Sequence, residues 1–321
     1  MRALSVAVIA CASCAVHAQK APAPTTLKFD WGPKLEANVL AVREEVSEAG
    51  DAVRASKLEA RYRMRAERTD RGYVVTFSDL QMMLDGKPVP ASAEPERMAA
   101  LGGLALDYDV APNGDFVSLR NVTALQTYAE RSFRAQNESL PANERPTPEQ
   151  ADKAMKAGAS REVVELNGSR TWGALVGMWA GLPLQEGKPI QSQSPVNIPV
   201  VNVPVTLNTR TELVRRESCS SREEKLNCVR LRASSEIDPA QLAAAIERFN
   251  KTTGRATTDS GSMDVDYHYE LVTDPTTLKP HHAEWSTGAT VANREGGGEK
   301  VSSTQSSTVT MTFDYSPLPK Q

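Results

Sequence analysis

The sequence is poor in the residue types that usually carry chemistry. Its 321 residues include four histidines and four cysteines, and 5% of the residues are aromatic. The sequence contains no Gly-x-Ser-x-Gly nucleophile motif, and its glycine-rich stretches lack the Ser or Thr that a phosphate loop requires. We therefore predict no catalytic residue, no metal ligand and no cofactor, and a protein that is not an enzyme.

The sequence also lacks a strong charge excess and a long internal apolar run. Its formal net charge is −3, which gives no basic stripe of the kind that binds nucleic acid. After the first eighteen residues, no apolar run approaches the roughly 20 residues that span a bilayer. With 40% hydrophobic residues, a chain of this length can bury a sizeable core. We expect a globular protein with no nucleic-acid partner and no transmembrane segment once its N-terminus is removed.

The first eighteen residues have the layout of a secretory signal peptide. Arg2 precedes an apolar run over residues 3–16, and the small residues that follow end at Ala18, before the polar Gln19. We predict cleavage between Ala18 and Gln19 and a periplasmic or secreted location. A Pro-rich leader, residues 19–26, would then form the new N-terminus.

A lipid anchor at Cys11 or Cys14 is the alternative to cleavage after Ala18. Residues 8–11, Val-Ile-Ala-Cys, resemble a bacterial lipobox. The segment ahead of this cysteine is short for a lipoprotein signal, so we favour ordinary cleavage.

Cys219 and Cys228 are the only cysteines after the first twenty residues. An oxidising compartment favours a disulfide between them, and the polar connector SSREEKLN suits a hairpin tip. Closing a loop of about ten residues stabilises a fold by roughly 2.5–3 kcal/mol. A metal site would need a further His or Cys nearby in sequence, and a redox pair favours Cys-x-x-Cys. We predict a disulfide, with these two roles as the alternatives.

Alternating apolar and polar residues predict strands toward both ends of the chain. Residues 57–68 place small and apolar side chains on one face and charged ones on the other, and residues 308–315 alternate as clearly. Between the two groups, an apolar stripe at helical spacing predicts a helix over residues 121–136. Thr147 and Pro148 open a second helix that we expect to reach about Leu166.

Long strands with one apolar face must cover that face. We predict an α+β fold in which a strongly curved, mainly antiparallel sheet of about ten strands, a half-barrel, packs on a few helices. We expect a single domain over residues 27–317. It would consist of a first β part (27–119), a helical segment (120–190) and a second β part with one helix (191–317).

Three features together resemble the periplasmic lipoprotein-carrier (LolA/LppX-like) fold and other secreted bacterial proteins of this build. They are the signal-peptide layout, the long alternating strands and the tyrosine-rich stretch DVDYHYELVTDPTTLKP at residues 264–280. The resemblance implies a lipid or another apolar ligand between sheet and helices. It transfers no functional residue to this chain.

Four side chains at helical spacing are the candidates to line such an apolar pocket: Trp172, Leu175, Val176 and Trp179. Trp31 and Trp285 would lie at its rim. A sheet with helices in its mouth commonly encloses a pocket. Core packing explains buried tryptophans equally well, and both interpretations stay open.

The leading hypothesis is a non-enzymatic exported protein that binds a lipid or another apolar molecule. An envelope interaction or scaffold protein is the alternative, using either the strand after Pro204 as an exposed edge or the charged strand Arg61–Arg65. The sequence names no protein partner. A hydrolase with a dispersed site that includes His268 or His281 is the third.

His281 and His282 are neighbours in an expected strand and point to opposite faces, so we predict no metal ion shared by both. The Ser/Thr-rich tract at residues 302–310 is interpreted as the solvent face of a strand.

Overall fold

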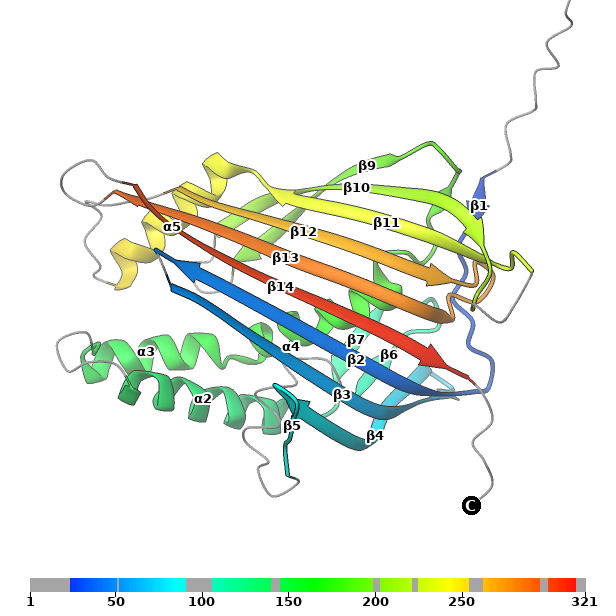
Figure 1. Ribbon diagram of the computed structural model, residues 1–321, viewed down its shortest axis with the longest axis horizontal. Coiled ribbons are helices and arrows are strands. Elements are labelled where there is room, and N and C mark those ends of the chain that lie inside the picture. Colours follow the sequence, from blue (N-terminus) through cyan, green and yellow to red (C-terminus); the bar gives the residue numbers. More distant parts are fainter. Residues whose placement is uncertain are drawn as a thin grey trace, which may run out of the picture.

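The computed structural model describes residues 24–50, 52–90, 106–139, 145–198, 203–220, 225–253, 262–294 and 300–315 (Figure 1). The predicted signal peptide, its cleavage site at Ala18 and the two N-terminal cysteines lie outside these residues. The boundaries of the predicted single domain stay a prediction.

An open sheet of twelve antiparallel strands dominates the fold. Its strand order is β7-β6-β4-β3-β2-β14-β13-β12-β11-β10-β9, and β5 pairs with β4 beside this path. The C-terminal strand β14 lies between β2 and β13, so the end of the chain joins the first and second groups of strands. The strands are β2 (Lys34–Ala49), β3 (Ala52–Thr69), β4 (Gly72–Leu84), β5 (Lys87–Pro88), β6 (Tyr108–Val110), β7 (Phe116–Leu119), β9 (Ile190–Ile198), β10 (Val203–Glu217), β11 (Cys228–Ile237), β12 (Ser262–Thr273), β13 (Pro280–Arg294) and β14 (Lys300–Asp314).

The helices of the described residues lie mainly in the middle of the chain, as predicted. They are α2 (Val122–Ser139), α3 (Pro148–Gly158), α4 (Arg161–Trp172), the π-helix η1 (Gly173–Gly177) and α5 (Pro239–Thr253). Helices α2 and α3 lie side by side, and a two-residue pair of strands, β1 (Thr25–Thr26) with β8 (Pro183–Leu184), stands apart from the main sheet (Figure 1). The predicted α+β class with a mainly antiparallel sheet is confirmed.

The expected single helix from Pro148 to about Leu166 was wrong, because the chain breaks it in two. The capping box at its start is present, with the Thr147 side chain accepting from the Gln150 backbone N–H. At the far end of α3, Ser160 takes an extended conformation, and its side chain accepts from the Val163 backbone N–H at 3.3 Å. A second N-cap therefore starts α4 as a separate helix.

The expectation that the strand after Pro204 lies at an edge was also wrong. Strand β10 pairs with β9 on one side and β11 on the other, and Pro204 faces Asn197 of β9. The edge strand on this side of the sheet is β9, which carries Pro195. A proline is tolerated at a sheet edge because its missing N–H costs no ladder hydrogen bond on the open side.

One hydrophobic core joins the sheet to the segment that runs through α4 and η1. Its centre is a cluster of aromatic rings, in which Trp172 stands 5.4 Å from Trp31 and 5.7 Å from Tyr108 between ring centroids. The Trp172 indole N–H donates to the Gly114 carbonyl at 2.8 Å, and the Trp31 indole N–H donates to the Leu278 carbonyl at 3.2 Å. The rings are thus buried with their polar atoms satisfied, which fixes α4 and η1 against the sheet.

The close approach of α4 to the neighbouring segments depends on Gly168. A Cβ at this position would lie 2.6 Å from Leu119 Cδ1 and 3.1 Å from Leu106 Cδ1. We predict that Gly168→Ala lowers the free energy of unfolding by about 1–3 kcal/mol, because the surrounding side chains must move. Gly158→Ala in α3 is the matched control, since a Cβ there meets nothing within 4 Å. It should be neutral or stabilising by up to about 1 kcal/mol. Urea denaturation of both variants checks this, and equal effects would contradict the packing described.

Candidate functional site

The registers of the long strands place inward-facing side chains in transverse rows across the sheet. Alternate residues of a strand point to opposite faces, and we call the face that packs on α4 and η1 the inner face. The apolar row is the set of register partners that forms the floor of the core: Leu213, Leu231, Leu271, Ala283, Met311, Ala41, Ala60 and Met82. None of these side chains is more than 4% exposed. The apolar row is therefore fully covered.

Four residues further along each strand, the side chains on the inner face are mostly polar. The hydroxyl row is the set of register partners Ser192, Thr209, Ser235, Tyr267, Thr287, Ser307, Glu45 and Ser56. Seven of these eight residues carry a hydroxyl group. Ser235 is buried and the others are half-buried or exposed, so most of the row is within reach of solvent. Within the row, Thr209 Oγ1 and Ser235 Oγ lie 2.8 Å apart in a hydrogen bond.

A mixed boundary row separates the apolar row from the hydroxyl row: Thr211, Ala233, Tyr269, Trp285, Val309, Arg43 and Leu58. Its centre is aromatic, since Tyr269 and Trp285 are direct register partners and both are half-buried against the core. Along the inner face, the three rows change from apolar through an aromatic boundary to hydroxyl-bearing. Beyond the hydroxyl row, α5 covers a second apolar patch, in which Val205 is buried against Ala245 with Val196 and Ile237 beside them. This change of chemistry on one continuous surface is the candidate functional site.

An ion pair connects the boundary row to the hydroxyl row on β2. Arg43 Nε lies 3.2 Å from Glu45 Oε1, and the Arg43 side chain is 16% exposed against 43% for Glu45. Burial lowers the pKa of Arg43, and the neighbouring Glu45 carboxylate opposes this change. Because the two charges have opposite sign, the pair adds no net charge to the site.

The phenol of Tyr269 lies in a partly desolvated position. Burial, followed by the neighbouring Tyr267, raises the pKa of Tyr269 to about 12, while the Arg170 guanidinium of α4 lowers it. The phenol therefore stays neutral at physiological pH and can donate or accept a hydrogen bond. The arrangement of hydroxyl, phenol and indole groups is suited to binding a ligand.

The four predicted pocket residues lie inside the packed core. Trp172 and Trp179 are 1% and 0% exposed, and Leu175 and Val176 are buried beside them. Trp31, expected at a rim, belongs to the same buried cluster. Trp285 alone of this set reaches the boundary row. A ligand pocket lined by the four stays a prediction.

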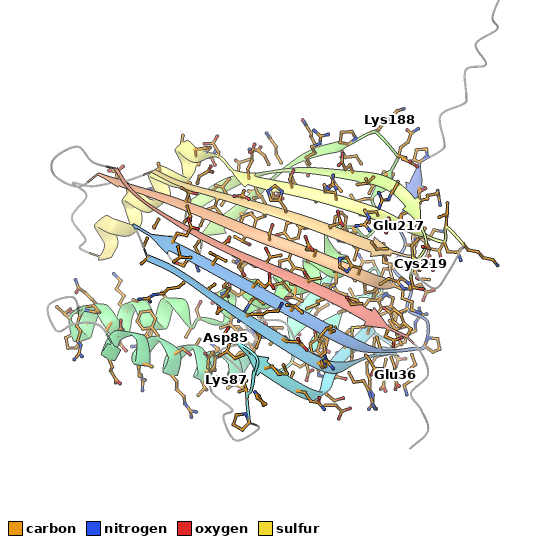
Figure 2. The ribbon with its side chains drawn as sticks, in the orientation of Figure 1. Glu36, Asp85, Lys87, Lys188, Glu217 and Cys219 are labelled. Atoms are coloured by element: carbon orange, nitrogen blue, oxygen red, sulfur yellow. A yellow bond between two sulfur atoms is a disulfide. The ribbon has the colours of Figure 1, made fainter. Side chains whose placement is uncertain are left out.

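A separate cavity of about 450 Å³ lies near the β4–β5 end of the sheet. Its lining mixes apolar and charged side chains: Glu59, Arg61, Leu80, Gln81, Met82, Met83, Pro88 and Val89. Asp85 and Lys87, labelled in Figure 2, mark the turn beside it. Met83 is 39% exposed, so the cavity offers an apolar wall at the molecular surface.

The predicted disulfide between Cys219 and Cys228 is confirmed. It lies at one end of the sheet, where Figure 2 labels Cys219 next to Glu217 of β10. His281 of β13 lies beside it: one ligand atom of each of the three residues is within 4.8 Å of the others. This neighbour could not be predicted from local sequence, because His281 is more than fifty residues from Cys228 along the chain and only the sheet brings it near.

The remaining candidates from the sequence lie on the outer face. His268 Nε2 lies 3.0 Å from Asp266 Oδ2, and both side chains are more than half exposed. His268 and His281 lie on different strands, β12 and β13. On the outer face the register partners of His268 are Ser234 and Ser286, whereas His281 lies beside the disulfide sulfurs. The outer face is otherwise rich in paired charges, such as Arg230 between Glu217 and Glu270. Such pairs explain these residues as a solvated surface.

The hydroxyl row as a whole could not be recognised from the sequence, although one part of it falls in a stretch with an unusual composition. The Ser/Thr-rich tract at residues 302–310 was interpreted as a solvent face, and Thr308 and Thr310 fit that interpretation. Ser307, however, is two residues from buried Val309 and lies on the inner face. The other members come from strands far apart in sequence, and only the register brings them together.

Comparisons with known proteins add little to this geometry. No protein-family model matches the sequence, and no curated protein matches it. Among solved structures, a LolA superfamily protein from Nitrosomonas europaea aligns with 9% identity over 88% of this chain and 87% of that chain, with a TM-score of 0.12. A TM-score of this size carries no argument about fold or function.

Among the helices of the described residues, none is both long enough and apolar enough to cross a membrane.

The raised pKa of Tyr269 makes a prediction about stability at high pH. The unfolded chain releases the phenolic proton near pH 10 and the folded chain near pH 12, so this contribution to stability is complete below pH 10 and is lost between pH 10 and 12. A pKa that is higher by two in the folded chain corresponds to a free-energy difference of about 2–3 kcal/mol. We predict that Tyr269→Phe removes this loss, so that its unfolding free energy falls less steeply over this range. Urea denaturation at pH 9.5 and 11.5 checks it; parallel pH curves for the variant and the natural protein would refute the assignment.

Proposed function

We propose that this protein is a non-enzymatic, exported binding protein for an amphipathic molecule, a lipid with an uncharged, hydroxyl-bearing polar part. The ligand lies on the inner face of the sheet, across the boundary row. The observation that supports this proposal is the change from the apolar row to the hydroxyl row within four residues of each strand.

The boundary row and the hydroxyl row favour different parts of one ligand. A purely apolar chain laid over Thr287 and Ser307 would remove their hydroxyl groups from water without a new partner, at about 1–3 kcal/mol for each group left unpaired. A purely polar ligand would gain nothing from the half-buried rings of Tyr269 and Trp285. A molecule with an apolar part against the rings and a polar part along the hydroxyl row satisfies both.

The charges within the boundary row and the hydroxyl row favour an uncharged polar part. Arg43 and Glu45 neutralise each other at 3.2 Å. An anionic or cationic head group would have to compete with this existing pair for one of its members. Hydroxyl groups can instead exchange hydrogen bonds with Ser, Thr and Tyr side chains, each of which can donate and accept.

We predict that an alkyl glucoside binds more tightly than a fatty acid of the same chain length, because only the glucoside matches the hydroxyl row. Thr287→Trp, at the centre of the row, should weaken binding of the glucoside at least about tenfold by filling the position of its polar part. Calorimetric titration below the micellar concentration of each amphiphile measures both effects.

Ser286→Trp is the matched control, because Ser286 is the neighbouring residue of β13 and lies on the outer face opposite His268 and Thr308. It should bind like the natural protein. If neither amphiphile binds, the proposed function is refuted. Equal binding of the two amphiphiles would refute the assigned polar part.

A scaffold role is the second candidate, and the edge strand β9 favours it. Within the described residues β9 pairs with β10 alone, and its residues 191–195 are exposed. Such an edge can accept a strand from another chain. We predict that a photo-crosslinking amino acid at Gln193 gives one adduct of fixed mass in cells if this role holds. The same group at exposed Thr290, on a strand with neighbours on both sides, is the control. Equal adducts at both positions would count against an edge-specific partner.

A further inference from the structure

We propose that Cys219, Cys228 and His281 form a binding site for a thiophilic divalent cation of the Zn²⁺ class when the disulfide is reduced. Cys219 lies in a bend after β10, Cys228 is the first residue of β11, and His281 is the second residue of β13. One potential ligand atom of each residue lies within 4.8 Å of the other two. This site is distinct from the hydroxyl row and does not depend on the proposed lipid ligand.

The three ligands match a known coordination preference. Zn²⁺ binds thiolate sulfur at about 2.3 Å and imidazole nitrogen at about 2.0 Å in tetrahedral geometry, which puts ligand atoms roughly 3.4–3.8 Å from one another. In the disulfide the two sulfurs are 2.06 Å apart, so they must separate after reduction, while the His281 ligand atom already lies within 4.8 Å of both. Cys219 is outside the strands and half-buried, so its side chain can turn with less resistance than that of Cys228, which is fully buried.

The packing around His281 holds its ring at the site. The imidazole makes an edge contact with the Tyr315 ring, with 5.3 Å between centroids. The Tyr315 hydroxyl donates to the Pro280 carbonyl, and Lys279 Nζ lies 3.7 Å from the centroid of the same ring. These contacts tie the start of β13 to the residue that follows β14, so His281 does not depend on the disulfide for its position. Two thiolates balance the charge of a divalent cation, which limits its repulsion by Lys279.

Reduction opens the site in a balanced two-electron step. A dithiol in the surroundings of the exported protein attacks the disulfide, the bond between Cys219 Sγ and Cys228 Sγ breaks, and both sulfurs end as thiols while the dithiol is oxidised to its own disulfide. Cation binding then displaces the two thiol protons to solvent and forms two metal–sulfur bonds and one bond to a His281 nitrogen. A water molecule completes the tetrahedron. The oxidised protein has no thiolate and cannot form this site.

Co²⁺ titration tests the proposal, because thiolate-bound Co²⁺ has a charge-transfer absorption band and a tetrahedral visible spectrum. The full chain carries Cys11→Ser and Cys14→Ser, so that Cys219 and Cys228 supply the only thiols, and it is reduced with a phosphine. We expect one Co²⁺ per chain with both spectral signatures, displacement by Zn²⁺, and no such spectrum in the oxidised protein. Circular dichroism of the reduced protein should match that of the oxidised one.

The histidine ligand is tested by His281→Asn, with His282→Asn as the matched control on the opposite face of the strand. His281→Asn should weaken Co²⁺ binding at least tenfold and alter the visible spectrum, while His282→Asn should leave both unchanged. Equal spectra and affinities for the two variants would overturn the proposal. So would loss of the fold on reduction, because His281 would then no longer lie beside the two sulfurs.

Discussion

The burial of the apolar row beneath α4 and η1 is the interaction on which the rest of the structure depends. Trp172 and Trp179 are fully buried there, and their indole N–H groups are satisfied by backbone carbonyls at 2.8 Å. Burial of large apolar side chains is the main favourable term in folding, and here it fixes which part of the inner face lies beneath α4 and η1. The hydroxyl row lies between this covered part and a second apolar patch at Val205 and Ile237, which α5 covers.

The sequence predicted the elements well, because each depends on local rules. Alternation in residues 57–68 indicated a strand, and Thr147 with Pro148 marked the start of a helix. Where local rules competed, the prediction was wrong: Ser160 provided a second N-cap inside the expected helix, and tertiary pairing placed Pro204 in an internal strand. The two cysteines could be paired from sequence because nine positions separate them and no other partner was near.

The candidate site could not be predicted, because it is a property of register. Ser235, Thr287 and Glu45 are separated by dozens or hundreds of residues, and each is an ordinary polar residue in its own strand. A shift of one residue in any pairing would move its side chain to the other face and break the row. The same holds for His281, which reaches the disulfide through the order of strands in the sheet. Sequence patterns report the two faces of a strand, but they do not report which residues lie level with one another.

The central claim is that the inner face is covered at the apolar row and accessible to a ligand at the hydroxyl row, and thiol labelling along β14 tests it most directly. Single cysteines replace Met311, Ser307 and Thr308, and their labelling rates are measured in the folded protein with and without an alkyl glucoside. The account predicts that the thiol at position 311 is protected, that those at 307 and 308 react, and that the glucoside slows labelling at 307 alone. Protection at 307 as strong as at 311, or equal slowing at 307 and 308, would contradict it.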